Sequence, residues 1–246
     1  MTPIVMVAWP DVSADAYVSE AQSLGAALIL NAQGGGGQWL DESGNGLHGA
    51  ESGGATWHAT GGPTVGIPGF YRLTSGTLSH LDFGDDPLLR FGQVTLAWWE
   101  QNGHSSESGD ENNAVRIAKG DRAYQVRRPS LAPSWPSLQW MARNNDAASE
   151  ASAHAYEVVT GAWQFFVGRI SSTYVDIWDV TSGTAVLLDS VAYTGGLESN
   201  TDPFSIGAQH DRTAWRRWWS GDIAGVLAFP TVLTSAQMEG LHAAAL

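Results

Sequence analysis

The chain has 246 residues, of which 43% are hydrophobic and 15% are charged, with 12 tryptophans and 29 glycines. Aromatic side chains favour pleated, half-buried surfaces and glycine supplies tight turns, so this composition favours one large all-β domain. A formal net charge of −13 argues against nucleic-acid and anionic-membrane partners, and the absence of cysteine excludes disulfides, thiolate zinc sites and cysteine nucleophiles.

The first 25 residues predict an arm and a short helix that precede the main domain. The arm is apolar, and its large side chains before the first charged residue include Ile4, Val5, Met6, Val7 and Trp9. No lysine or arginine precedes this short run, so we expect no signal peptide. An extended apolar segment can lie on its own sheet as an edge strand, or it can anchor the chain to a neighbouring subunit.

The segment after the arm predicts a helix, a strand and a turn. Ser13 can cap a helix over residues 15–24, on which Tyr17, Ala21 and Leu24 share one face. Residues 26–30 then predict the first strand of the main domain, which we place at residues 26–246. The glycine run 34–37 has no lysine after it, as a phosphate-binding loop requires, and it therefore predicts a flexible turn.

From residue 54 onward, short apolar runs alternate with turn residues, which is typical of a two-sheet antiparallel sandwich. We expect strands over residues 70–73, 78–83, 93–100, 114–118, 124–128, 137–142, 155–159, 163–170, 174–180, 186–191, 203–208 and 221–229. Val94, Leu96 and Trp98 alternate with their neighbours, and we expect this face and Trp163 in the core between the sheets. The polar stretch 101–113 predicts an exposed loop, and Thr234 predicts the start of a short C-terminal helix.

Several motifs, in order, make the chain resemble the laminin-G-like group of concanavalin A-like jelly-roll domains. They are Asp41-Glu42-Ser43-Gly44-Asn45-Gly46 followed by Trp57, residues 91–98, Ala118-Lys119-Gly120 with Tyr124, residues 163–167, Pro203-Phe204-Ser205-Ile206-Gly207, and residues 221–223 with 233–237. The resemblance implies two curved antiparallel sheets packed face to face. It also implies a role in binding glycans or proteins.

The same resemblance implies a structural calcium ion held by Asp41 and its neighbours, including Asn45. Calcium requires six to eight oxygen ligands. The acidic pair that supplies further ligands in relatives is absent here, because residues 223–226 read Ile-Ala-Gly-Val, and Asp222 lies one residue away on the opposite strand face. Alternatively, Asp41 and Asn45 close the turn with hydrogen bonds to the backbone.

The sequence does not favour catalysis, and we expect no catalytic residues. Glycosidases of this fold carry alternating carboxylates on one strand, which this sequence lacks. There is no Gly-x-Ser-x-Gly elbow, and the seven histidines show no metal-ligand spacing.

A basic and aromatic cluster near the C-terminus is the predicted ligand site. Flat indole rings stack on sugar faces, and arginine can pair with them. The predicted binding residues are His210, Asp211, Arg212, Trp215 and Arg216, with Trp135 as a second exposed aromatic candidate. The alternative is that Trp215 covers a sheet edge and the arginines balance nearby acids. One of Trp218 and Trp219 is expected in the core.

These patterns predict a non-catalytic structural or binding module displayed on a surface. A domain of this type without a signal peptide resembles virion components of tailed phages, such as decoration, fibre or tail proteins. Its partners would then be other protein subunits, including capsid or tail proteins, and possible host glycans, with a virion or extracellular location. The alternative is a carbohydrate-binding lectin module attached to a secreted or cell-surface system.

Overall fold

The structure, a computed structural model, describes residues 14–31, 33–101, 114–120, 123–128, 138–143, 150–155 and 159–246. The apolar arm with Ile4, Val5, Met6, Val7 and Trp9 lies outside the described residues. So do Trp135 and nearly all of the loop predicted over residues 101–113.

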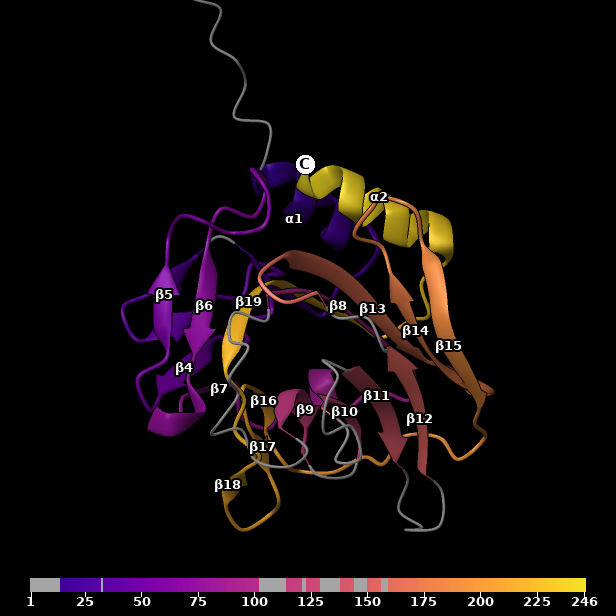
Figure 1. The fold of residues 1–246 in the computed structure, drawn as a ribbon. Coiled ribbons are helices and arrows are strands. Elements are labelled where there is room, and N and C mark those ends of the chain that lie inside the picture. The colour runs from indigo at the N-terminus through magenta and orange to yellow at the C-terminus, as the bar shows by residue number, and fades with distance from the viewer. Residues whose placement is uncertain are drawn as a thin grey trace, which may run out of the picture.

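Two large antiparallel sheets face each other, which confirms the predicted jelly-roll sandwich (Figure 1). The first sheet has the order β15 (Val186–Ala192), β14 (Tyr174–Asp179), β13 (Trp163–Ile170), β8 (Val94–Gln101), β19 (Gly221–Phe229), β6 (Phe70–Leu73) and β5 (Thr56–His58), with β1 (Leu28–Leu30) also paired to β19. The second sheet has the order β12 (Glu150–Ala155), β11 (Leu138–Arg143), β10 (Tyr124–Arg127), β9 (Val115–Lys119), β16 (Phe204–Ile206), β7 (His80–Asp82), β4 (Gly49–Ser52), β3 (Gln38–Trp39) and β2 (Gly34–Gly35).

The main hydrophobic core lies between the two sheets. Val94, Leu96 and Trp98 are fully buried in it, which confirms the predicted inward face of β8. The prediction for Trp163 was wrong. This residue is only half-buried, and it packs in a second cluster on the outer face of the first sheet. The reason is the alternation of strand side chains: Phe166, three residues along β13, points into the inter-sheet core instead.

The second cluster joins the first sheet to two helices that lie over its outer face (Figure 1). Helix α1 (Ala14–Ser23) begins within one residue of the predicted start, and α2 (Ser235–Ala245) is closed by a capping box between Thr234 and Gln237. The buried hydroxyl of Tyr17 donates a 2.7 Å hydrogen bond to the carbonyl of Gly225, at a bulge in β19. Helix α1 is therefore packed against the sandwich.

The glycine run forms a hairpin, and the predicted turn is confirmed for only half of it. Gly34 and Gly35 form β2 and pair with β3, whereas Gly36 and Gly37 form the turn between the two strands. A side chain at Gly34 would approach the indole of Trp57 to 2.4 Å, so glycine here allows close packing. Most of the strand predicted over residues 155–159 lies outside the described residues, and its first residue, Ala155, is the last residue of β12.

The short elements at the end of the second sheet shape the candidate site. Two short 3-10 helices, η1 (Ser75–Thr77) and η2 (Pro87–Leu89), follow β6 and β7 respectively. A loop over residues 193–203 connects β15 to β16. Beyond β16, a small hairpin of β17 (Gln209–His210) and β18 (Trp215–Arg216) projects from the lower edge in Figure 1.

Candidate functional site

A polar pocket lies where the loop before β16 meets the β17–β18 hairpin. We call it the 198–212 pocket, and its walls are residues 198–203 together with His210 and Arg212. Its volume is about 480 Å³. Small-molecule sites in proteins span roughly 300–1,000 Å³, so this pocket has room for a small ligand.

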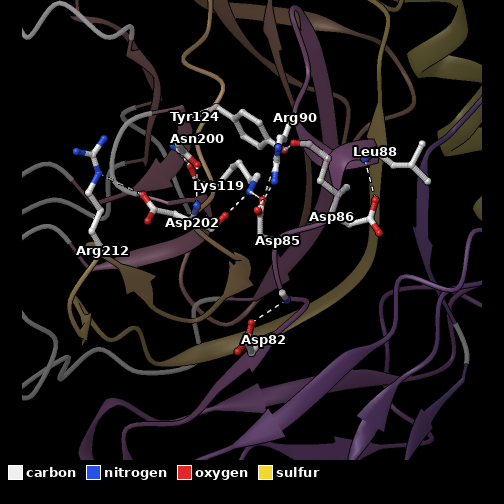
Figure 2. Close-up of polar contacts among 12 residues, drawn as sticks. Asp82, Asp85, Asp86, Leu88, Arg90, Lys119, Tyr124, Asn200, Asp202 and Arg212 are labelled. Atoms are coloured by element: carbon white, nitrogen blue, oxygen red, sulfur yellow. Dashed lines mark hydrogen bonds and ion pairs between the residues drawn. The ribbon is translucent and has the colours of Figure 1, made fainter.

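Two buried carboxylates and one arginine form the charged part of the wall. Glu198 and Asp202 are only 6% exposed each. The Arg212 Nη2 donates to Glu198 Oε1 at 2.9 Å, and its Nε lies 4.0 Å from Asp202 Oδ2. Figure 2 shows Arg212 beside Asp202, with a dashed line that marks their ion pair. One guanidinium therefore serves two carboxylates.

Buried hydrogen bonds hold the loop that carries Asp202. The amine of Lys119 is buried between the carboxylate of Asp85 and the backbone carbonyl of Asp202, and it donates a hydrogen bond to each (Figure 2). Burial lowers the pKa of Lys119, and the hydrogen bond to Asp85 offsets part of that shift. The Asn200 Oδ1 accepts a 3.2 Å hydrogen bond from the backbone N–H of Asp202. These contacts fix the loop before a ligand arrives.

Three polar atoms on the pocket wall are buried and have no hydrogen-bond partner within the part of the chain that the structure describes. They are Glu198 Oε2, Asp202 Oδ2 and His210 Nδ1. A buried polar group without a partner costs about 1–3 kcal/mol, so such groups at a pocket mark places that a ligand can satisfy. The two carboxylate oxygens can only accept hydrogen bonds when ionised, and hydroxyl groups can donate to them.

The structure divides the predicted ligand residues among three places. His210 and Arg212 line the pocket. Asp211 and Arg216 pair with each other on the hairpin, with Arg216 Nε 2.7 Å from Asp211 Oδ2. A hydrogen bond from the Thr213 hydroxyl is the largest cause of the lowered pKa of Asp211. These residues hold the hairpin turn.

Trp215 lies behind the pocket wall and does not line it. Its ring centroid is 4.1 Å from that of His80 and 5.0 Å from that of His210, so the indole packs on one side against the second sheet. It is half-buried, an arrangement that fits the sheet-covering alternative. Trp218 is also buried against His80, and Trp219 is fully buried in the inter-sheet core as expected for one member of that pair.

Sequence reasoning missed Glu198, Asn200 and Asp202. The run from Glu198 to Asp202 contains two acids and three other polar residues directly before a buried strand. That polarity is also typical of an ordinary loop. The two acids reach one wall because the loop packs against Arg143 of β11 and Lys119 of β9.

The predicted calcium ligands form a closed turn in the structure. The Asp41 Oδ1 accepts hydrogen bonds from the N–H groups of Ile29 and Ser43, at 3.0 and 2.9 Å. Its Oδ2 accepts from the Ser43 hydroxyl and the Leu47 N–H, at 2.7 and 3.0 Å. Asn45 donates its amide to the carbonyl of Ala27 at 2.9 Å.

This donor set does not fit a calcium ion. Both Asp41 oxygens already receive N–H or O–H donors, whereas a cation requires oxygen lone pairs that point toward it. Within the described residues, no three His, Asp or Glu side chains lie close enough to hold a metal. The geometry favours the turn-closing role of Asp41.

Comparisons with known proteins place the fold among binding domains. The chain is similar to the botulinum neurotoxin serotype C1 binding domain, with 14% identity and a TM-score of 0.64 over 89% of this chain and 51% of that one. It is similar to the binding domain of botulinum neurotoxin DC in complex with SialylT, with 11% identity and a TM-score of 0.65 over 91% and 52%. The chain thus spans about half the length of these toxin domains.

A third similar structure matches this chain in size. It is domain 4 of a GH43 extracellular arabinanase from Geobacillus stearothermophilus, in complex with arabinotriose, with 15% identity and a TM-score of 0.60 over 82% of this chain and 91% of that one. A scan of the sequence against known protein families finds no match, and neither does a search of curated proteins. Among the described residues, no helix is long and apolar enough to cross a membrane. These comparisons show that the fold is a β-sandwich shared with binding domains.

Proposed function

We propose that the chain is a non-catalytic carbohydrate-binding module whose site is the 198–212 pocket. The observation that carries the proposal is a pair of buried carboxylate oxygens in residues that line the pocket, Glu198 Oε2 and Asp202 Oδ2, which have no hydrogen-bond partners among the described residues. Sugars present many hydroxyl donors on a small rigid ring. Preformed acceptors on a fixed wall bind such rings with little loss of conformational entropy.

Two similar structures support a sugar as the ligand class. The arabinanase domain was solved with arabinotriose, and this chain spans 91% of its length. A toxin binding domain was solved with SialylT, although this chain spans only about half of it. Because identities of 11–15% show only a shared fold, the pocket carries the proposal, and these two structures make sugars the ligand class to test first.

Blocking the pocket tests the proposal. Thr201 is exposed on the rim, so Thr201→Trp should fill the opening without disturbing the buried wall. We expect the native protein to bind members of a glycan array, and we expect Thr201→Trp to lose that binding with an unchanged melting temperature. Glycan binding that survives Thr201→Trp, or no binding by the native protein, would contradict the proposal.

The biological setting is the finer part of the proposal. A sugar-binding sandwich fits both a virion surface, as predicted from the sequence, and a secreted or cell-surface system. Virion partners such as capsid or tail subunits remain predictions. Recovery of the native chain within a large particle, followed by identification of the neighbouring subunits, tests the virion setting.

A further inference from the structure

We propose that the 198–212 pocket selects neutral glycans and rejects acidic ones such as sialylated or uronic-acid sugars. This inference rests on the proposed function and names the ligand class of the same site.

The charge of the pocket wall carries the first step. Glu198 and Asp202 contribute two negative charges, and the single guanidinium of Arg212 lies 2.9 Å from one carboxylate and 4.0 Å from the other. Among the described residues, Lys119 also lies beside this wall, and it is already paired with Asp85 at 2.8 Å. A ligand carboxylate would therefore meet two buried carboxylates that share one arginine, and like charges in a buried site repel strongly.

The hydrogen-bonding capacity of the wall carries the second step. Glu198 Oε2 and Asp202 Oδ2 are acceptors that are buried and lack partners among the described residues. A sugar hydroxyl can donate to either oxygen, but an ionised sugar carboxylate has no proton to donate. Either acceptor can therefore take a hydroxyl group of the ligand but not an ionised carboxylate.

His210 is compatible with the same ligand. Its Nδ1 is buried at the pocket without a partner in the described part of the chain. A hydroxyl group both donates and accepts, so it satisfies this nitrogen in either tautomer of the imidazole.

The test compares neutral and acidic glycans on one array, with the native protein, Thr201→Trp and four further variants. Glu198→Gln and Asp202→Asn keep the side-chain shape but remove one charged acceptor each. Glu20→Gln removes one negative charge from α1, on the far side of the molecule from the pocket in Figure 1. Ser199→Arg adds a positive charge at an exposed rim position and leaves the buried wall intact.

The native protein and Glu20→Gln should bind neutral glycans only. A hydrogen bond to a charged group is worth enough that Glu198→Gln and Asp202→Asn should each weaken the Kd for neutral glycans by about tenfold or more. Glu198→Gln, Asp202→Asn and Ser199→Arg should also admit acidic glycans, a gain that simple unfolding cannot produce. Ser199→Arg covers the case in which the buried-wall variants fold poorly.

The outcomes separate the two proposals. A native protein that prefers acidic glycans and loses them in Thr201→Trp overturns the neutral selectivity but keeps the sugar site. Acidic glycans that stay unbound by both Glu198→Gln and Ser199→Arg also overturn the charge argument. Absence of any glycan binding by the native protein removes the sugar site and the selectivity together.

Discussion

Arg72 on β6 and Asp222 on β19 lie directly opposite each other and form a two-point ion pair, with both N–O distances at 2.8 Å. The Asp222 carboxylate is 4% exposed, whereas the Arg72 side chain is 47% exposed. Asp222 is the acid that stands one residue away from the calcium motif of similar domains. Here it is paired with an arginine, on the side of β19 that the sequence alternation predicts.

This difference in exposure predicts that the loss of Arg72 destabilises the protein more than the loss of the Asp222 charge. Arg72→Met leaves a buried, unpaired carboxylate and should destabilise the protein by about 3 kcal/mol. Asp222→Asn leaves an arginine that water can solvate, so it should cost only about 1 kcal/mol. Urea unfolding of the two single variants and the double variant measures both costs and their coupling. Equal costs for the two single variants would contradict the asymmetry.

A second prediction concerns Asp41. Because its carboxylate accepts four hydrogen bonds, three from backbone N–H groups, Asp41→Ala should lower the free energy of unfolding by about 3 kcal/mol. Asp86 accepts a single bond from Leu88 at the start of η2, so Asp86→Ala should cost about 1 kcal/mol.

Thermal melts of the native protein distinguish the turn-closing role of Asp41 from a calcium-binding role. Thermal melts with a chelator and with added calcium should coincide for the native protein, since a bound ion would stabilise the folded state. A melting temperature that drops in chelator and recovers with calcium would reverse the assignment.

A third prediction concerns two tryptophans that the sequence treats alike. Trp98 is fully buried between the sheets, and its Nε1 donates to Glu100 at 2.9 Å, so Trp98→Ala should cost about 3–5 kcal/mol. Trp163 is half-buried on the outer face, so Trp163→Ala should lower the free energy of unfolding by clearly less. Chemical denaturation of both variants checks the order, and a larger cost at Trp163 would contradict the layer assignment.

The sequence predicted those parts of the fold that depend on local patterns. The strands β13 and β19, of eight and nine residues, are mostly apolar, and both were predicted with their observed bounds. The strands β2 to β5 were missed because their glycine-rich and polar residues carry no alternation. A tertiary contact positions β2, because the indole of Trp57 lies against the backbone of Gly34.

The candidate site was predicted only in part for the same physical reason. His210 and Arg212 stood out as histidine and arginine in an acidic chain with few bases. Glu198 and Asp202 did not, because single acids in a loop are common. Their significance arises from burial and from the shared Arg212, which depend on the folding of this loop against the ends of β9 and β11 and beside the β17–β18 hairpin.

A fourth prediction concerns pH. His80 is buried beside Trp215 and Trp218, and this burial lowers its pKa, although a hydrogen bond to the Leu78 carbonyl offsets part of the shift. The unfolded chain binds this proton near its ordinary pKa of about 6.5, while the folded chain stays neutral to lower pH. The stability that His80 contributes is therefore fully present above about pH 6.5 and is lost as the pH falls below it.

Unfolding measured at a series of pH values tests this linkage. The native free energy of unfolding should fall between about pH 7 and pH 5, and His80→Gln should reduce that slope. Burial lowers the pKa of His154 as well, so His154→Gln should remove a separate part of the slope. A slope that neither variant changes would show that other groups cause the pH dependence.

The last prediction concerns the N-terminal segment, where two deletions separate the apolar arm from helix α1. Tyr17 and Ala21 are fully buried, and the Tyr17 hydroxyl bonds to Gly225 in β19, so α1 contributes to the stability of the sandwich. Deleting residues 1–24 should therefore strongly lower the melting temperature, and Tyr17→Phe should cost about 1 kcal/mol.

Deleting residues 1–13 removes the predicted anchor residues Ile4 to Trp9 but none of these contacts. If the arm anchors the chain to a neighbouring subunit, the shorter deletion should keep a nearly native melt and lose assembly with that subunit. If the shorter deletion instead unfolds or precipitates, the arm belongs to its own sandwich as an edge strand, and the anchoring prediction fails.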